Sequence, residues 1–368
     1  MTFRVAAFEA EELSQFSRAI DKLLEKYAAI QHLRDLRDQT DAGSYSPALW
    51  QAISEQQLLP EADGAAALPL SVWTETFTAL GRHLAQTPLL DTLLAARLAA
   101  QAGWPAIHDW HQGTPAGDRC LATIGLETQQ DIRAEAVAGG WVLRGSAQGV
   151  LNAAEASHFV VCARLDNGSD GLFWIDAGSV SLGTARRLLD SGRSFEVSFN
   201  ALELDAAQCW VDTDGCAAAI AQTQQLAQLL LAFQLQGVAE SALNIGLEWL
   251  STREQFGVKI GSFQALQHRA GRAYLELEKL KALNAESLAK VTSDAGQLPG
   301  RATACKFFAC KVSRLITGEA IQWHGGIGMT DECDIGFFYK FAATLGARFG
   351  GREQQLQAWL NRSQQYEL

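Results

Sequence analysis

The spacing of apolar residues changes twice along the chain. In ELSQFSRAIDKLLEKY, residues 12–27, apolar residues recur at the 3.6-residue period of an amphipathic helix. From about 118 to 215 the pattern becomes short runs bounded by turn residues. AVAGGWVLRG and HFVVCARLDNGSDGLFWIDAG each predict two strands around a turn, and RSFEVSFNALEL alternates apolar with polar residues. From about 217 the helical spacing returns in longer, proline-free segments, so the chain has three successive regions.

These regions predict an α+β multidomain protein. Residues 1–115 form an N-terminal helical domain, residues 116–215 a middle antiparallel β domain, and residues 216–368 a C-terminal four-helix bundle. The four expected bundle helices start near residues 217, 263, 301 and 351, and the segment DAGQLPG at 294–300 separates the second from the third.

Composition narrows the class of protein. Hydrophobic residues make up 48% and charged residues 19%, as in an ordinary globular chain, and no apolar segment long enough to cross a membrane is expected. The net charge of −11 disfavours binding to nucleic acid. Seven scattered cysteines without a CxxC pair predict buried thiols in a reducing cytoplasm and no metal site. The acidic N-terminal segment does not have the pattern of a signal peptide.

One glycine-rich run is the first candidate for chemistry, QWHGGIGMTDE at residues 322–332. It is not a dinucleotide fingerprint, because a helix precedes it and Asp331 stands where the third glycine is needed. It is not a P-loop, because no Lys-Ser/Thr pair follows. Taken alone, such a run is most often the cap of a helix and a close packing turn.

A second motif changes that interpretation. TREQFGVKIGSFQALQH, residues 252–268, precedes the glycine run by some seventy residues. The pair REQFGxxIxxFQxxQ and QxxGGxGxT, with the helical–β–helical order, resembles the acyl-CoA dehydrogenase family over most of the chain. The resemblance implies FAD as cofactor, an acyl-CoA thioester as substrate, oxidation of its Cα–Cβ bond, and an oligomer in which FAD is shared across a dimer interface.

The resemblance also assigns residues. Arg253 is expected to reach the pyrophosphate of the partner subunit's FAD, since a guanidinium fork suits a diphosphate. The other expected contacts with the adenine half of that FAD are Phe256, Gln264, Gln322, Gly325, Gly326 and Gly328. His324 and His268 are interpreted as packed or surface histidines, and Trp323 as a core residue.

The catalytic base of the family is missing at both of its usual places. A carboxylate must remove the α proton of the thioester. The commoner position, 27 residues after Gln322, is occupied by Phe349, and the rarer one, 26 residues before Arg253, by Ala227. Glu353 lies four residues beyond Phe349 and is a weak candidate, because reaching the same place needs a backbone shift. The residue next to Ala227, Gln228, stands where many members have an arginine.

The β region departs from the family as well. TIGLETQQD at 123–131 replaces the usual T-E-P-x-A-G-S-D-like run, and Gly149 and Leu151 stand where the family packs a W-I-T/S segment on the flavin ring. The flavin-ring side of the site therefore looks eroded, and the side that reaches a neighbour looks intact.

This asymmetry favours one subunit of a heteromeric α2β2 acyl-CoA dehydrogenase, of the branch that degrades steroids and other bulky acyl groups. A second, unlike subunit then supplies the base. Two alternatives stay open. One is a self-sufficient homo-oligomeric dehydrogenase with a relocated carboxylate; the other is a non-catalytic scaffold that retains only the fold.

Overall fold

A computed structural model describes residues 10–28, 30–38, 43–56, 68–112, 120–128 and 130–363. The chain forms two compact units. The first contains the described residues of 31–69 and 86–227, and the second those of 7–30, 70–85 and 228–368. The order of helices, then strands, then helices agrees with the sequence prediction. The predicted boundary at 115/116 lies outside the described residues.

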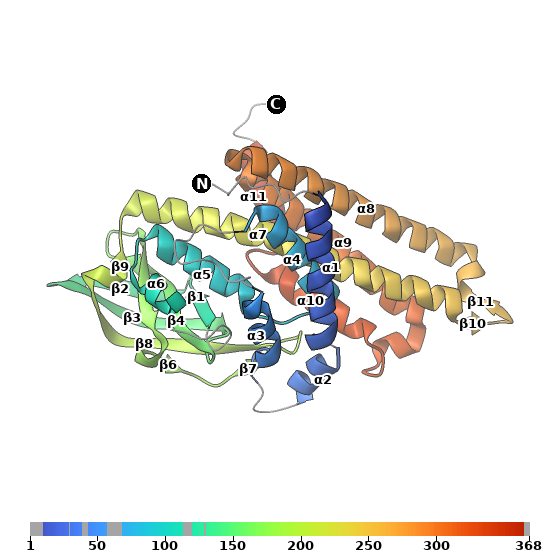
Figure 1. Ribbon diagram of the computed structural model, residues 1–368, viewed down its shortest axis with the longest axis horizontal. Helices are drawn as coiled ribbons and strands as arrows, with labels where there is room; N and C mark the ends of the chain where they lie inside the picture. Colours follow the sequence, from blue (N-terminus) through green and yellow to red (C-terminus); the bar gives the residue numbers. More distant parts are fainter. Residues whose placement is uncertain are drawn as a thin grey trace. The chain divides into compact units, whose positions relative to one another are not determined.

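The first unit is built on one mixed β-sheet (Figure 1). Its strands follow the order β6-β8-β3-β2-β4-β5-β9, with β1 paired to β4 and β7 to β8. Both predicted hairpins are present, because β2 pairs with β3 and β4 with β5, each pair antiparallel around its turn residues. The strands are β1 (Cys120–Ile124), β2 (Asp131–Val137), β3 (Gly140–Leu151), β4 (Ala156–Leu165), β5 (Asp170–Asp176), β6 (Ser181–Leu182), β7 (Arg186–Arg187), β8 (Arg193–Asp205) and β9 (Cys209–Trp210).

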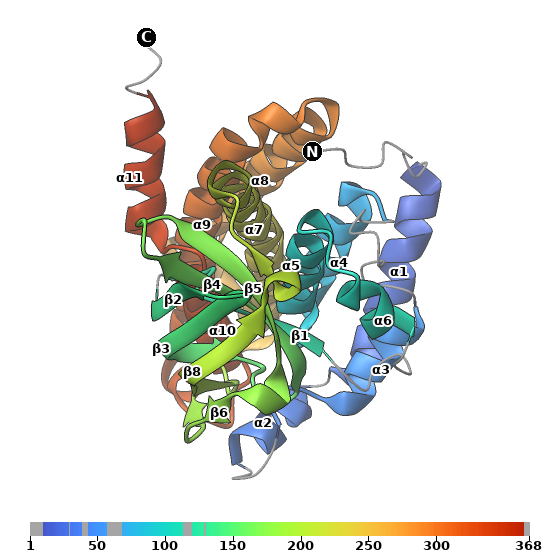
Figure 2. The same ribbon diagram turned by 90° about the vertical axis from the view of Figure 1, so that its left-hand side faces the viewer.

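The sequence predicted an antiparallel sheet, but the sheet also contains parallel pairs of strands. Strand β4 pairs in parallel with both β1 and β2. Such pairings join strands that are not neighbours in sequence, so no local turn signal announces them. Helix α5 (Leu89–Gln101) covers β1 (Figure 2). Leu121 of β1 donates its backbone N–H to the Thr92 hydroxyl at 3.2 Å, and that hydroxyl donates to the Leu121 carbonyl at 3.3 Å.

Three further short helices lie wholly or almost wholly within the residues of the first unit, and α7 straddles both units. The three are α2 (Ile30–Asp38), α3 (Pro47–Glu55) and α6 (Ala106–Gln112). Helix α7 (Thr213–Thr252) is long and apolar enough to cross a membrane by length and composition, contrary to the expectation from sequence. Because 78% of its most apolar window is buried within the protein, its apolar character is that of a core helix.

The second unit is mainly helical. Besides the end of α7 it contains α1 (Ala10–Tyr27), α4 (Leu70–Arg82), α8 (Gln264–Ser293), α9 (Leu298–His324), α10 (Ile335–Ala347) and α11 (Arg352–Ser363). Helix α9 is central, since α8, α10 and α11 all pack against it. The predicted break before α9 is present at Asp294. Helix α10 was missed from sequence, so the described residues from 213 onward contain five helices rather than four.

Two glycines allow α4 and α7 to approach closely. A Cβ on Gly237 of α7 would stand 2.0 Å from the carbonyl oxygen of Thr78, and one on Gly81 of α4 would stand 1.9 Å from that of Gln234. Real Cβ atoms do not approach backbone this closely, so glycine is required at both positions. The backbones of the two helices are therefore in direct contact at this crossing.

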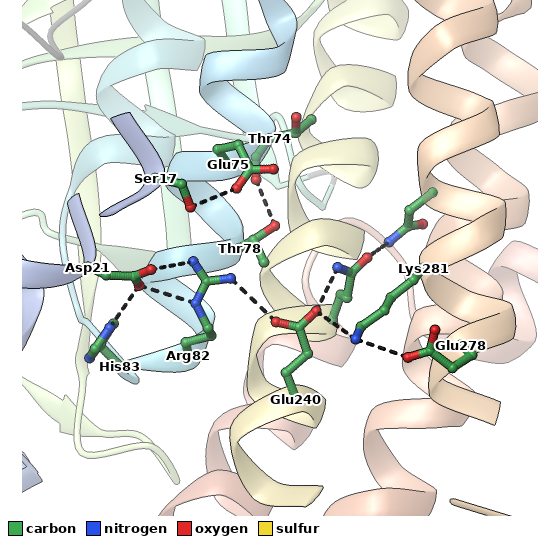
Figure 3. A network of polar contacts seen from close by, with 12 residues as sticks. Ser17, Asp21, Thr74, Glu75, Thr78, Arg82, His83, Glu240, Glu278 and Lys281 are labelled. Atoms are coloured by element: carbon green, nitrogen blue, oxygen red, sulfur yellow. Dashed lines mark hydrogen bonds and ion pairs between the residues drawn. The ribbon is translucent and has the colours of Figure 1, made fainter. Parts of the chain in front are cut away.

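A polar network runs beside the same crossing (Figure 3). The Arg82 guanidinium donates to both carboxylate oxygens of Asp21, at 3.2 and 2.9 Å, and to Glu240 at 3.4 Å. His83 Nε2 lies 3.0 Å from the same Asp21 carboxylate. Glu240 also lies 3.8 Å from Lys281 of α8. The network thus joins α1, α4, α7 and α8 within one unit, at side chains that are only partly exposed.

Candidate functional site

The first sequence motif forms an exposed arm at the end of α7. After Thr252 the chain makes a two-strand hairpin, β10 (Glu254–Gln255) and β11 (Val258–Lys259). Phe256 and Gly257 at its tip both have positive φ, 56° and 78°, as the common two-residue hairpin turn requires. Every residue from 251 to 259 is exposed, and Phe256 is 91% exposed. Such an apolar tip favours contact with another molecule.

The second motif begins at the last turn of α9. Gly325 ends that helix with φ 66° and ψ −141°, a conformation that only glycine adopts readily, and a 3₁₀ turn follows at Gly325–Met329. Gly325 and Gly326 are exposed, and a Cβ on either would meet nothing within 4 Å. Gly328 differs, because a Cβ there would stand 2.6 Å from the Ile321 carbonyl oxygen. Packing within the chain alone therefore requires glycine at 328.

The two motifs meet through a stack of rings. Trp249, on the last turns of α7, stacks on His324 at the end of α9, with ring centroids 4.7 Å apart and an interplanar angle of 20°. The guanidinium carbon of Arg253 lies 5.7 Å from the centroid of the Trp249 ring. Arg253 and the glycine turn that starts at Gly325 are thus brought to one surface of the second unit, although some seventy residues separate them in sequence.

Two other residues predicted to contact FAD are exposed and lie outside this stack of rings. Gln264 opens α8, and Gln322 lies on the last turn of α9. Phe256 lies against Phe263, with ring centroids 6.4 Å apart. The predicted residues other than Gly328 are therefore all exposed, which suits contact with a ligand held outside this chain.

The donor set at this surface fits a phosphate-bearing cofactor. Among the described residues, the Arg253 guanidinium has no carboxylate partner, and it is exposed. It therefore offers its planar N–H fork to an external anion, the geometry that suits a diphosphate. The open space above Gly325 and Gly326 admits a ligand close to the backbone. These features match the predicted contact with the pyrophosphate and adenosine of FAD.

Comparison with known proteins assigns the fold and the family. The model of the acyl-CoA dehydrogenase C-terminal domain matches residues 213–362, which include both motifs. FadE27 of Mycobacterium tuberculosis is 26% identical, with 92% of this chain and 93% of that protein covered. The chain contains an acyl-CoA dehydrogenase C-terminal domain and is similar to members of that family over nearly its whole length. It is accordingly an oxidoreductase of the class that acts on CH–CH bonds, and members of the family depend on FAD.

Other relatives extend over nearly the whole chain. IpdE2 of Mycolicibacterium smegmatis is 26% identical, covering 94% of this chain and 97% of its own length. The structure of a variant of the Tcur3481-Tcur3483 steroid ACAD is similar with a TM-score of 0.84 and 26% identity, covering 97% of this chain and 98% of that one. The ChsE4-ChsE5 complex from Mycobacterium tuberculosis matches in fold, with a TM-score of 0.84, 23% identity and both chains covered in full.

The turn where this family usually places its base carries an aromatic residue here. Phe349 is only 4% exposed and has φ 51°, and Gly350 has φ 92°. The Phe349 carbonyl accepts hydrogen bonds from Gln228 Nε2 at 3.1 Å and from Gln355 Nε2 at 2.8 Å. Glu353 is exposed on the first turn of α11. Phe349, at the position where the sequence resemblance predicts the base, has no side-chain group that accepts a proton.

A buried lysine supports the same turn. Lys306 of α9 is fully buried, and its Nζ donates to the carbonyl oxygens of Leu345 at 2.9 Å and Gly346 at 3.0 Å. These carbonyls belong to the last turn of α10, where helical partners run out and the helix dipole favours a cation. Sequence reasoning missed Lys306 and Trp249, because Leu345 and His324, their partners, are distant in sequence. It missed Gln355 although the Phe349 carbonyl is only six residues away. No local pattern marks any of the three, since lysine, glutamine and tryptophan are ordinary residues of a helix.

Two other departures from the family pattern are structurally ordinary. Ala227, at the rarer position of the base, is fully buried on α7. In β3, Gly149 is exposed with φ 75° and open space beside it, and Leu151 is half-buried. No group of three or more His, Cys, Asp or Glu residues suited to a metal ion occurs in the part of the chain that the structure describes.

Proposed function

We propose that this chain is one subunit of a heteromeric FAD-dependent acyl-CoA dehydrogenase. Its unlike partner supplies the catalytic base and the flavin-ring pocket, and this chain supplies Arg253 and the 322–328 turn to the partner's FAD. The observation that carries the proposal is the buried phenyl ring of Phe349 at the position of the family's base. Two similar structures support it, since each is named for two components, Tcur3481-Tcur3483 and ChsE4-ChsE5.

The reaction explains why the base is decisive. Oxidation of the Cα–Cβ bond begins with loss of a weakly acidic α proton next to the thioester carbonyl. Bound FAD supplies the hydride acceptor. A phenyl ring offers no site for the proton. Moving Glu353 of α11 to the position of Phe349 would need a backbone shift, and that shift would break the hydrogen bonds to the Phe349 carbonyl. The proton acceptor must then come from another chain.

Arg253 gives this chain a separate task. Its exposed guanidinium, without a carboxylate partner among the described residues, matches the charge and the fork geometry of a pyrophosphate. The exposed hairpin tip at Phe256 and the open glycines at 325 and 326 give the surrounding surface for an adenosine. All these groups belong to a face that a neighbouring subunit can approach.

The substrate of the complex is an acyl-CoA thioester, and a bulky acyl group of the steroid type is favoured. The support is the similarity to the Tcur3481-Tcur3483 steroid ACAD, together with the small residues Ala227 and Gly149. The seven free cysteines fit the reducing cytoplasm as the compartment.

The test begins with purification of the native complex, asking whether a second acyl-CoA dehydrogenase-like chain and FAD accompany this one. In the reconstituted complex, Arg253→Ala should raise the dissociation constant for FAD about ten- to a hundredfold, the loss expected for hydrogen bonds to a charged group. Flavin fluorescence during titration of the FAD-depleted complex measures it.

Arg133→Ala is the matched control, because Arg133 is an exposed arginine on β2 with a side chain 77% exposed. It should leave FAD affinity unchanged. Equal FAD affinity of the wild-type and Arg253→Ala complexes would contradict the proposal.

A further inference from the structure

The Arg253 side chain lies against a pair of stacked aromatic rings. The guanidinium lies over Trp249, and Trp249 lies on His324, at 5.7 and 4.7 Å between the respective centres. Trp249 lies on the last turn of α7, and Arg253 directly follows that helix and donates its backbone N–H to the Trp249 carbonyl at 2.9 Å. His324 comes from the end of α9. The stack therefore ties the exposed arginine to two helices of the same unit.

The lowest plane is firmly held. His324 is 8% exposed, and its Nδ1 lies 2.7 Å from the Ala320 carbonyl oxygen one turn earlier. Because a carbonyl oxygen only accepts hydrogen bonds, Nδ1 carries the proton, and the plane of the ring is fixed. A Cβ on Gly328 would stand 2.9 Å from the His324 Cβ, so the following turn packs directly against the base of this side chain.

The approach of α7 to α9 is set one turn before Trp249. A Cβ on Gly246 would stand 2.6 Å from the Trp323 ring, so glycine at 246 lets α7 lie against the neighbour of His324. Trp323 is itself buried, at 4% exposure. This close contact brings Trp249 to the imidazole of His324, and the Arg253 guanidinium lies over the same indole ring.

We infer that Trp249 and His324 are positioning residues for Arg253, holding its guanidinium in place for a pyrophosphate before the ligand arrives. This inference rests on the proposed function of Arg253. An exposed arginine has a flexible side chain, and ordering it on binding costs affinity. A cation over an indole face restricts that freedom in advance, and the contact of an exposed pair corresponds to about a two- to fivefold change in affinity.

A single substitution of Trp249 cannot tell a role in positioning Arg253 from a role in the fold or in direct contact with the cofactor. If Trp249 acts through Arg253, its removal matters only while the arginine is present. If Trp249 merely stabilises the fold, or touches the cofactor itself, its removal has the same effect with or without the arginine. A cycle of single and double variants distinguishes these cases.

The experiment measures FAD dissociation constants of the reconstituted complex for wild type, Trp249→Leu, Arg253→Ala and the double variant. We expect Trp249→Leu to weaken FAD binding about two- to fivefold. Trp249→Tyr should lose much less affinity, and Trp249→Leu should add nothing to the loss from Arg253→Ala.

A second pair of variants repeats the comparison at His324. We expect His324→Leu to weaken FAD binding and His324→Phe, which keeps a ring, to leave it unchanged.

Each contrary result has one meaning. Equal losses from Trp249→Leu in both backgrounds would overturn the positioning role while leaving Arg253 as the cofactor contact. An unchanged affinity in Arg253→Ala would instead overturn the proposed function. If Trp249→Leu prevents assembly of the complex, the His324 pair carries the same test, and no difference between its leucine and phenylalanine variants refutes the inference.

Discussion

Replacing Arg82 by methionine should destabilise the second unit, because it removes the cation that two carboxylates share. Arg82, Asp21 and Glu240 have side chains that are 23%, 28% and 15% exposed. Breaking a fully buried pair costs about 3–5 kcal/mol, and an exposed pair is worth about 1 kcal/mol or less. His83 and Lys281 remain as neighbours of the two carboxylates. We therefore expect a loss of about 2 kcal/mol in the free energy of unfolding.

The pH dependence checks the cause. Burial raises the pKa of Asp21, but hydrogen bonds and charge from His83 and Arg82 outweigh it, so its pKa lies below the ordinary value. A lowered folded-state pKa stabilises the fold above the unfolded pKa of about 3.9, and this contribution is lost as the pH falls through the folded pKa. The deficit of Arg82→Met should thus be full at pH 7 and shrink below about pH 4.

Urea denaturation of the isolated chain at pH 7 and at pH 3.5, followed by circular dichroism, measures the loss in the free energy of unfolding caused by Arg82→Met. Adding Asp21→Asn and Glu240→Gln to Arg82→Met removes the unpaired charges, and should recover most of the loss at pH 7. A deficit that is the same at pH 7 and pH 3.5, and that the added substitutions leave unchanged, would refute an electrostatic cause in favour of lost packing.

Two further predictions concern the same unit. Gly237→Ala should cost about 3 kcal/mol of stability or prevent folding, since its Cβ would meet the Thr78 carbonyl oxygen at 2.0 Å. Gly318→Ala, in the interior of α9 with open space around it, should stabilise the protein by about 0.5–1 kcal/mol. Thermal unfolding compares the two variants, and equal midpoints would contradict the close crossing of α4 and α7. Glu75→Gln should raise the urea midpoint at pH 7 and leave it unchanged at pH 3.5. Burial, with Glu240 and Asp21 nearby, raises the pKa of Glu75 despite the Ser17 hydrogen bond and Arg82, so its favourable contribution is lost as the pH rises through that pKa; a lower midpoint at pH 7 would refute this.

The features that follow from local sequence were the predictable ones. The hairpins β2–β3 and β4–β5 were predicted because their turn residues, GG and DNGSDG, lie between runs with strand periodicity. Helix α1 was predicted from its single apolar stripe. The two motifs were recognised because each is a continuous segment, and their meeting on one surface was implied only by the resemblance.

The features that depend on distant partners were not predictable. Helix α10 is short and rich in aromatic residues, and its packing against α9 decides its conformation. The parallel pairing of β1 with β4 joins strands with two others between them. Lys306 has the sequence pattern of an ordinary helix residue, and only the end of α10 explains its burial. The stack of Trp249 on His324 likewise needs both helices in place.

We propose that this chain lacks its own catalytic base and works with a partner that has one. The most direct measurement is the rate of acyl-CoA oxidation, with an artificial electron acceptor and saturating FAD, for the chain alone and for its complex with the co-purified subunit. We expect no rate above background for the chain alone and clear turnover for the complex. Turnover by the chain alone at the rate of the complex would contradict the claim, and would point to a carboxylate of this chain as the base.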